Sequence, residues 1–165
     1  MFRRLPAVKS LQPREGMASL RVCLATIFLS FALGPPPRGT YSYASDLARY
    51  LRERDFSVFF SEETAPPGGQ LDRTLLAALL HSKILVVVVN RGTLREPRWV
   101  RSEVSEFRKH HPDRRVIIIN VDGALQDPAL AQGAQEWLTY RDKIWLDESA
   151  EAASAGIAAQ IWLNV

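Results

Sequence analysis

One unbroken run of β-branched and other apolar residues, "KILVVVV" at residues 83–89, constrains the fold of this chain more than any other feature. Val and Ile favour β-strands. A strand that shows no alternation of apolar and polar residues is buried on both faces, as happens in a parallel sheet covered by helices. The chain has 165 residues, which is enough for one domain with a core of this kind.

Strand-like and helix-like segments alternate along the rest of the chain. Apolar segments typical of strands lie within residues 22–34 and at 56–60, 83–89, 114–121 and 142–147. Amphipathic segments typical of helices occupy 41–55, 70–82 and 97–110, with a loop and an irregular helix at 122–138 and a final helix at 148–165. "GPPPRGTY", "SEETAPPGGQ" and "NRGTLRE" are predicted loops. The pattern predicts a flavodoxin-like, doubly wound α/β domain, with five parallel strands in the order 2-1-3-4-5 and helices on both faces.

The first 21 residues differ from the rest in charge. They hold five basic residues and one acidic residue, which leaves 16 basic and 17 acidic residues in the remainder. We therefore expect a separate basic leader over 1–21 and a domain over 22–165. The basic leader followed by an apolar run is also typical of a secretion signal, in which case residues 1–34 would be removed. The strand interpretation is favoured because the sheet needs this segment as its central strand.

Composition excludes some classes of partner. The nearly neutral body carries no basic patch for nucleic acid, and no apolar run reaches the roughly 18 residues of a membrane span.

A single cysteine, Cys23, allows no internal disulfide and suggests a reducing, cytoplasmic compartment. The chain stops on the apolar "IWLNV", so we expect it to be a fragment of a longer protein.

Ligands of open α/β sheets bind at the carboxyl ends of the strands. The predicted helix at 97–110 starts from that edge, and its Val100, Val104 and Phe107 form one stripe toward the sheet. Glu103 falls about 60° from the centre of the stripe and Trp99 about 100°, on the same side. Glu103 is thus predicted to be a boundary carboxylate, suited to catalysis or binding. Alternatively, it is a half-exposed helix residue that pairs with Arg98, Arg101 or Arg108.

Other chemistries find little support in the sequence. The glycine motifs of dinucleotide-binding and phosphate-binding loops are absent, as is the G-x-S-x-G motif of a serine nucleophile. Three histidines with poor spacing do not indicate a zinc site. A phosphoacceptor receiver domain needs an aspartate at the end of the third strand, where this chain has Asn90.

Three segments together resemble the Toll/interleukin-1 receptor (TIR) domain, over about residues 22–163. "IFLSFA" at 27–32 resembles the first conserved box of the family. Residues 56–90 resemble its second strand, Pro-Gly loop, second helix and third strand, and "EPRWVRSEV" resembles its Trp-x-x-x-Glu segment. The resemblance is to the bacterial, NAD-hydrolysing type. The Pro-rich loop after the first strand is longer than usual, and Ser102 stands where some active relatives have an aromatic residue.

The resemblance implies an NAD⁺ glycohydrolase that releases nicotinamide and forms ADP-ribose or cyclic ADP-ribose. Glu103 would be catalytic, Trp99 would line the same cleft, and further nucleotide contacts would come from Ser30, Phe31, Ala32, Phe60 and Ser61. For Phe31 and Phe60 plain core packing is an open alternative, and Glu62 and Glu63 are expected to be solvated. NAD⁺ would be the substrate, with no cofactor or metal.

The resemblance also implies a biological setting. The domain would be the effector module of a bacterial immune, anti-phage or stress protein. Self-assembly through TIR–TIR contacts would activate it, under the control of a sensor domain or partner protein. The alternative is a non-catalytic TIR–TIR interaction module, in which Glu103 is only a surface residue.

Overall fold

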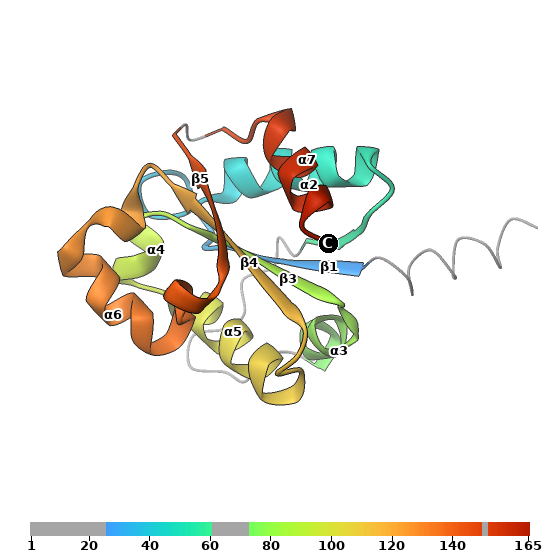
Figure 1. The fold of residues 1–165 in the computed structure, drawn as a ribbon, viewed down its shortest axis with the longest axis horizontal. Helices are drawn as coiled ribbons and strands as arrows, with labels where there is room; N and C mark the ends of the chain where they lie inside the picture. Colours follow the sequence, from blue (N-terminus) through green and yellow to red (C-terminus); the bar gives the residue numbers. More distant parts are fainter. Residues whose placement is uncertain (1–25, 61–72, 150–151) are drawn as a thin grey trace, which may run out of the picture.

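A five-stranded parallel sheet forms the centre of the molecule (Figure 1). The computed structural model describes residues 26–60, 73–149 and 152–165. The strand order is β2-β1-β3-β4-β5, as predicted. The strands are β1 (Thr26–Ser30), β2 (Ser57–Phe59), β3 (Ile84–Val89), β4 (Arg115–Val121) and β5 (Ile144–Glu148). Every residue of β3 is buried, which explains its unbroken apolar sequence.

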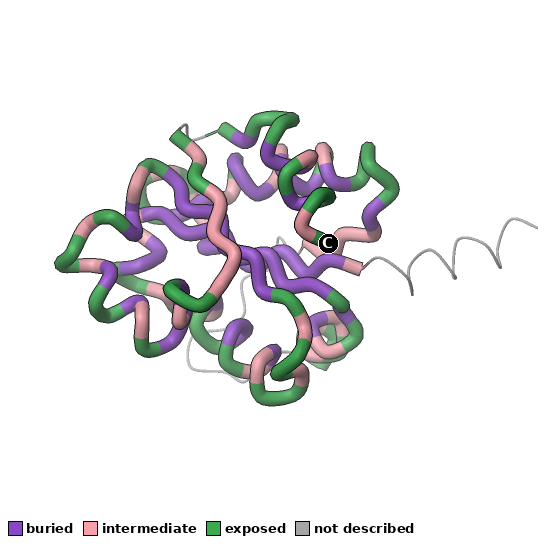
Figure 2. The backbone as a smooth tube through the Cα atoms, viewed as in Figure 1, coloured by how far each residue is buried: buried purple, intermediate pink, exposed green. Residues whose placement is uncertain are grey.

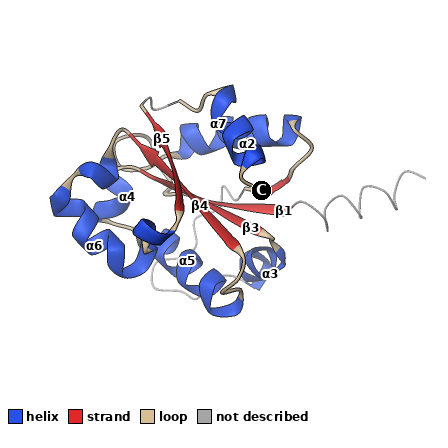
Figure 3. Ribbon diagram, viewed as in Figure 1, coloured by secondary structure: helices blue, strands red, loops and turns tan. Residues whose placement is uncertain are grey.

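Helices cover both faces of the sheet and enclose two separate apolar cores (Figures 2 and 3). One face packs against α2 (Tyr41–Glu53) and α7 (Ala155–Leu163). The other packs against α3 (Arg73–His81), α5 (Arg98–His110) and α6 (Pro128–Leu138). Short helical turns complete the chain: α4 (Arg91–Arg95), η1 (Ala124–Gln126) and η2 (Tyr140–Asp142).

Two of the predicted local structures are wrong, and side-chain caps explain both. The expected loop "NRGTLRE" contains the short helix α4, because the Asn90 side chain accepts a hydrogen bond from the Thr93 backbone N–H. The expected irregular helix is the regular α6, which begins with Asp127 as its cap and Pro128 in its first turn. The final helix, α7, is shorter than predicted.

Several expectations concern residues outside the described ranges. They include the basic leader over 1–21, the start of the apolar run at 22–25, and the Pro-Gly loop with Ser61, Glu62 and Glu63. Within the described ranges, no helix combines the length and apolar character needed to span a membrane.

Candidate active site

Glu103 lies in the second turn of α5 and is buried. Val100, Val104 and Phe107 form the buried stripe of α5, as their spacing predicts. Glu103 is only 7% exposed, so the prediction of a boundary carboxylate is wrong. The reason is that α5 packs against β1 as well as β3, so the flank beside the stripe is also covered.

Ser30 is the hydrogen-bonding partner of Glu103. It is the last residue of β1 and is 1% exposed. Its hydroxyl donates a hydrogen bond to Glu103 Oε2. Because β1 lies between β2 and β3, this pair sits at the carboxyl end of a central strand, where the strand order reverses. That is the place at which open α/β sheets bind ligands.

No basic side chain balances Glu103 among the residues that the structure describes. Arg98 forms its ion pair with Glu96, at 3.0 Å. Arg108 donates to the backbone carbonyls of Trp137 and Leu138 in α6, and Arg101 is exposed. The alternative of a half-exposed glutamate paired with one of these arginines is therefore wrong.

Burial sets the protonation of Glu103. Removal from water raises the pKa of the Glu103 carboxyl to about 8, and the hydrogen bond from Ser30 lowers the pKa by less than burial raises it. At pH 7 the carboxyl of the isolated domain therefore carries its proton most of the time. A strongly raised carboxyl pKa at the edge of an α/β sheet is typical of functional sites.

The other predicted contact residues fall into two groups on opposite faces of the sheet. Ala32 belongs to the same core as α5, and Trp99 is half-buried in the first turn of α5. Phe31 and Phe60 belong to the core under α2, where their rings stack with centroids 4.8 Å apart. Ser30 and Ala32 therefore lie on the same face of the sheet as Glu103. Phe31 and Phe60 pack against each other on the opposite face.

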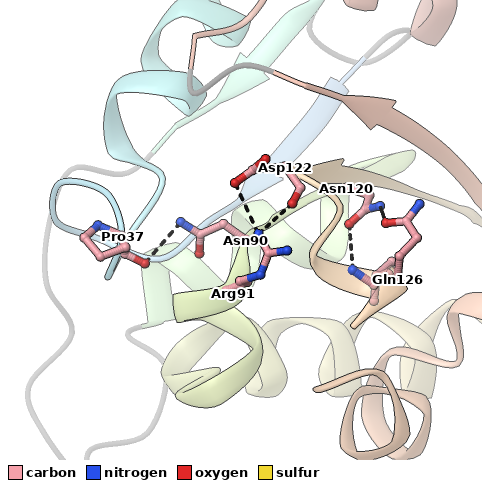
Figure 4. A network of polar contacts seen from close by, with 7 residues as sticks. Pro37, Asn90, Arg91, Asn120, Asp122 and Gln126 are labelled. Atoms are coloured by element: carbon pink, nitrogen blue, oxygen red, sulfur yellow. Dashed lines mark hydrogen bonds and ion pairs between the residues drawn. The ribbon is translucent and has the colours of Figure 1, made fainter. Parts of the chain in front are cut away.

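A second polar cluster at the same edge of the sheet was not anticipated from the sequence. The Asn90 side chain accepts hydrogen bonds from Thr93 N and Oγ1, both at 2.9 Å, and donates one to Gly39 O at 3.0 Å. Figure 4 shows the Asn90 amide directed at the Pro-rich loop, toward Pro37. An asparagine directly after a buried strand was the available signal for this tie between β3 and the loop after β1.

The neighbouring side chains Arg91, Asp122, Asn120 and Gln126 extend this cluster toward β4 (Figure 4), and Asp147 extends it to β5. Arg91 Nη1 donates to the Asp122 carbonyl at 2.7 Å and to its carboxylate at 3.2 Å. Asn120 donates to Gln126 and Asp147, both at 2.8 Å. These contacts satisfy the polar groups at the strand ends.

A small pocket of about 70 Å³ lies beside this cluster, on the α2 side of the sheet. Its lining residues are Pro36, Pro37, Gly39, Thr40, Tyr43, Asn90, Arg91, Val121 and Asp122. Glu103 is not among them. In the described part of the chain, no group of three or more His, Cys, Asp or Glu residues is arranged to hold a metal ion.

Comparison with known proteins supports the interpretation of the fold. The chain is similar to the TIR domains in the structure of the activated Roq1 resistosome directly recognizing the pathogen effector XopQ. The TM-score is 0.56 and the identity 18%, with 85% of this chain and 98% of that chain covered, which is a likeness of fold. No curated protein matches the chain. The family model of the TIR domain matches residues 27–157, a span that includes Ser30, Glu103 and every strand residue except Thr26, and the chain therefore belongs to the TIR domain family.

Proposed function

We propose that this TIR domain is an NAD⁺ glycohydrolase and that Glu103 is its catalytic residue. The observation that carries the proposal is the buried Glu103 carboxyl at the carboxyl end of β1, without a basic partner among the described residues. A purely structural glutamate would be expected at the surface or in an ion pair, because burying an unpaired acid destabilises the fold.

The chemistry of the reaction suits one carboxylate. In NAD⁺ the bond between nicotinamide N1 and ribose C1′ breaks, and its electron pair stays on the nitrogen, so nicotinamide leaves as a neutral molecule. Positive charge develops on the ribose, as in the oxocarbenium-like transition states of glycosidases. Ionised Glu103 stabilises that charge. Water then adds to C1′ and loses a proton to give ADP-ribose, or an adenine nitrogen adds to give the cyclic product.

The other predicted site residues are assigned substrate contacts according to the face of the sheet on which they lie. Trp99 lies one helical turn before Glu103 on α5 and Ala32 lies on the same face of the sheet as α5, and both would contact the nicotinamide riboside. Phe31 and Phe60, with Ser61 outside the described residues, would contact the part of the dinucleotide that crosses the end of β1. NAD⁺ is the substrate here, with no metal or further cofactor.

The proposal extends to assembly and setting. The solved relative is a resistosome in its activated form, which supports self-association as the route to activity. We place the domain in the cytoplasm, as the effector module of a bacterial immune or stress protein with a sensor domain or partner. Contacts between copies would then form a substrate cleft beside Glu103.

The test is release of nicotinamide from NAD⁺ by the domain fused to a tetrameric coiled coil. Glu103→Gln should lower the rate by about 10²–10³-fold, because it removes the charge that stabilises the transition state. Glu136→Gln is the matched control, since Glu136 is exposed on α6. Equal rates in the wild type and Glu103→Gln would exclude Glu103 as the catalytic group.

A non-catalytic interaction module is the second candidate, and one observation favours it. Glu103 is 7% exposed, so a substrate reaches it only after neighbouring residues move. In this case the tetrameric fusion would bind further copies of the domain and release no nicotinamide at any pH from 6 to 9.

A further inference from the structure

Ser30 donates a hydrogen bond to Glu103, and the proposed activity assigns no role to this contact. The Ser30 hydroxyl has a single proton to donate, and it donates that proton to Glu103 Oε2. Both side chains are buried, and they come from different elements, the end of β1 and the second turn of α5. The hydrogen bond therefore fixes the orientation of the Glu103 side chain relative to the C-terminal ends of the strands.

No charged group other than Glu103 itself contributes to the setting of this pair within the described residues. β1 and β3 contain no titratable side chain, and both pack against α5. The charged residues on the other elements that contact α5, and on α5 itself, are exposed or bound elsewhere: Arg73, His81, Arg98, Arg101, Glu106, Arg108, Lys109, His110 and Glu136. Burial and the Ser30 hydrogen bond are the only causes of the shift in the Glu103 pKa within the described residues.

The burial of Glu103 favours its protonated form, whereas the proposed catalysis needs its ionised form. Stabilising a sugar cation requires ionised Glu103, but burial keeps the proton on this carboxyl at pH 7. Two influences favour the ionised form: a hydrogen bond donated to it, and a positive charge brought close to it. The first is present in the structure as Ser30. The second is a property of NAD⁺ itself, whose nicotinamide ring is cationic before the bond breaks and neutral afterwards.

We propose that Ser30 is a positioning residue that orients the Glu103 carboxyl and favours its ionisation, and that binding of a cationic nicotinamide nucleotide expels the Glu103 proton to solvent. This proposal rests on the NAD⁺ cleavage proposed above. The substrate's own charge thereby prepares the catalytic group, so the charged form of Glu103 is abundant only when a pyridinium ring is bound. Selectivity follows: a reduced, neutral dihydronicotinamide does not ionise Glu103.

The size of the effect can be estimated. A positive charge within about 4–6 Å lowers a carboxyl pKa by roughly 1–3 units. Starting from a pKa of about 8, binding at pH 7 then releases roughly 0.4–0.9 proton per site. This quantity is measurable by calorimetry.

The positioning role of Ser30 is tested without any reference to activity. The carboxyl of Glu103 is followed by ¹³C NMR in a pH titration of the wild type and of Ser30→Ala, Ser30→Thr and Ser105→Ala. Loss of the hydroxyl in Ser30→Ala should raise the Glu103 midpoint by roughly half a unit to one unit. Ser30→Thr, which keeps a hydroxyl, should restore the wild-type midpoint, and Ser105→Ala, an exposed position on α5, should leave it unchanged.

Two results would overturn this part of the proposal. One is an unchanged midpoint in Ser30→Ala. The other is a wild-type midpoint near 4.5, the ordinary value for a glutamate. The second result is decisive even if Ser30→Ala fails to fold, because it needs only the wild type.

The release of a proton is tested by titration calorimetry of the tetrameric fusion in two buffers that differ in ionisation enthalpy. The ligand is carba-NAD⁺, which keeps the pyridinium charge and resists cleavage, and NADH is the neutral control. We expect roughly 0.4–0.9 proton released with carba-NAD⁺, and none with NADH or with Glu103→Gln. Binding of carba-NAD⁺ without proton release would refute the coupling.

The two proposals can fail separately. If carba-NAD⁺ does not bind and no nicotinamide is released, the NAD⁺ activity and the coupling to it are both excluded, while the NMR titration still decides what Ser30 does to Glu103. If nicotinamide is released and the Ser30→Ala midpoint does not move, the activity stands and Ser30 has no positioning role.

Discussion

At the scale of single residues, Glu103 is the position where stability and the proposed activity conflict. A carboxyl that is buried with one hydroxyl partner among the described residues contributes less to folding than an uncharged side chain of the same shape. Proteins tolerate such residues mainly at functional sites, where removing them increases stability. The conflict gives a test of the environment of Glu103 that is independent of catalysis.

We expect Glu103→Gln to be more stable than the wild type at neutral and alkaline pH. The Glu103 pKa rises from 4.5 in the unfolded chain to about 8 in the folded one. Between these values the folded state holds a proton that the unfolded state lacks. The contribution of Glu103 to the free energy of unfolding is therefore fully present below pH 4.5 and is lost as the pH rises toward 8, by at most about 1.4 kcal/mol per pH unit.

Chemical denaturation of both proteins from pH 4.5 to 8.5 measures this difference. The two curves should coincide near pH 4.5 and separate as the pH increases, with Glu103→Gln the more stable. Glu136→Gln, at an exposed position, should follow the wild type throughout. A constant difference between wild type and Glu103→Gln would show that Glu103 titrates normally.

The same shift predicts the pH dependence of nicotinamide release. Because the ionised carboxylate is the active form in the proposed mechanism, kcat/KM should rise with pH and level off above about 8, the pKa in the free domain. The rise in kcat should occur at lower pH, since kcat reports the complex with the cationic substrate. Rates measured across pH 5.5–9 give the pH profiles of kcat/KM and of kcat. The same midpoint in both profiles would contradict the proposal that the positive charge of the substrate favours ionisation of Glu103.

At the scale of elements, close packing of α4 under the Pro-rich loop shapes the carboxyl edge of the sheet. A Cβ atom on Gly92 would lie 2.1 Å from the Pro37 carbonyl oxygen, which is far inside van der Waals contact. The Asn90 amide fixes the same loop from the end of β3. Glycine is therefore required at residue 92 because two stretches of backbone meet there.

Gly92→Ala and Gly133→Ala should change stability in opposite directions. Gly92→Ala must displace the loop or α4, and we expect a loss of about 1–3 kcal/mol, typical of overpacking. Gly133 lies in α6 with nothing within 4 Å of its added Cβ, so Gly133→Ala should gain about 0.5–1 kcal/mol from helix propensity. Thermal and urea unfolding of both variants provide the comparison. Equal effects of the two substitutions would contradict the close contact at Gly92.

At the scale of the whole molecule, the proposed activity depends on association. Glu103, the proposed catalytic residue, is 7% exposed and has little access to substrate in a single copy. For the proposed reaction, contacts between copies or movement of neighbouring residues would have to open the end of β1. The resting domain is then expected to have low activity.

Nicotinamide release per domain should increase with the concentration of the domain, and fusion to a tetrameric coiled coil should raise it at a fixed low concentration. The increase should be at least tenfold if assembly supplies more than about 1.4 kcal/mol toward opening the site. A fusion whose coiled coil is disrupted by a proline is the control. The same rate per domain at all concentrations would show that a single copy is sufficient.

The local sequence determined most of the architecture of this TIR domain. The apolar run of β3 and the stripe of Val100, Val104 and Phe107 on α5 behave as predicted, because residue spacing along one strand or helix decides which face is buried. The alternation of strands and helices and the rule of right-handed crossovers left few topologies, and the order 2-1-3-4-5 chosen among them is the observed one.

Only the tertiary structure decided the character of the site. The depth of Glu103 depends on α5 resting on two strands, and its hydrogen bond comes from Ser30, 73 residues earlier in the chain. The alternation of side chains at the end of β1 places Phe31 on the face opposite Ser30, but which of these two faces receives Glu103 depends on where α5 packs. Local spacing determines which side of a helix faces inward, but the solvation and hence the charge of a carboxyl depend on all the segments that pack around it.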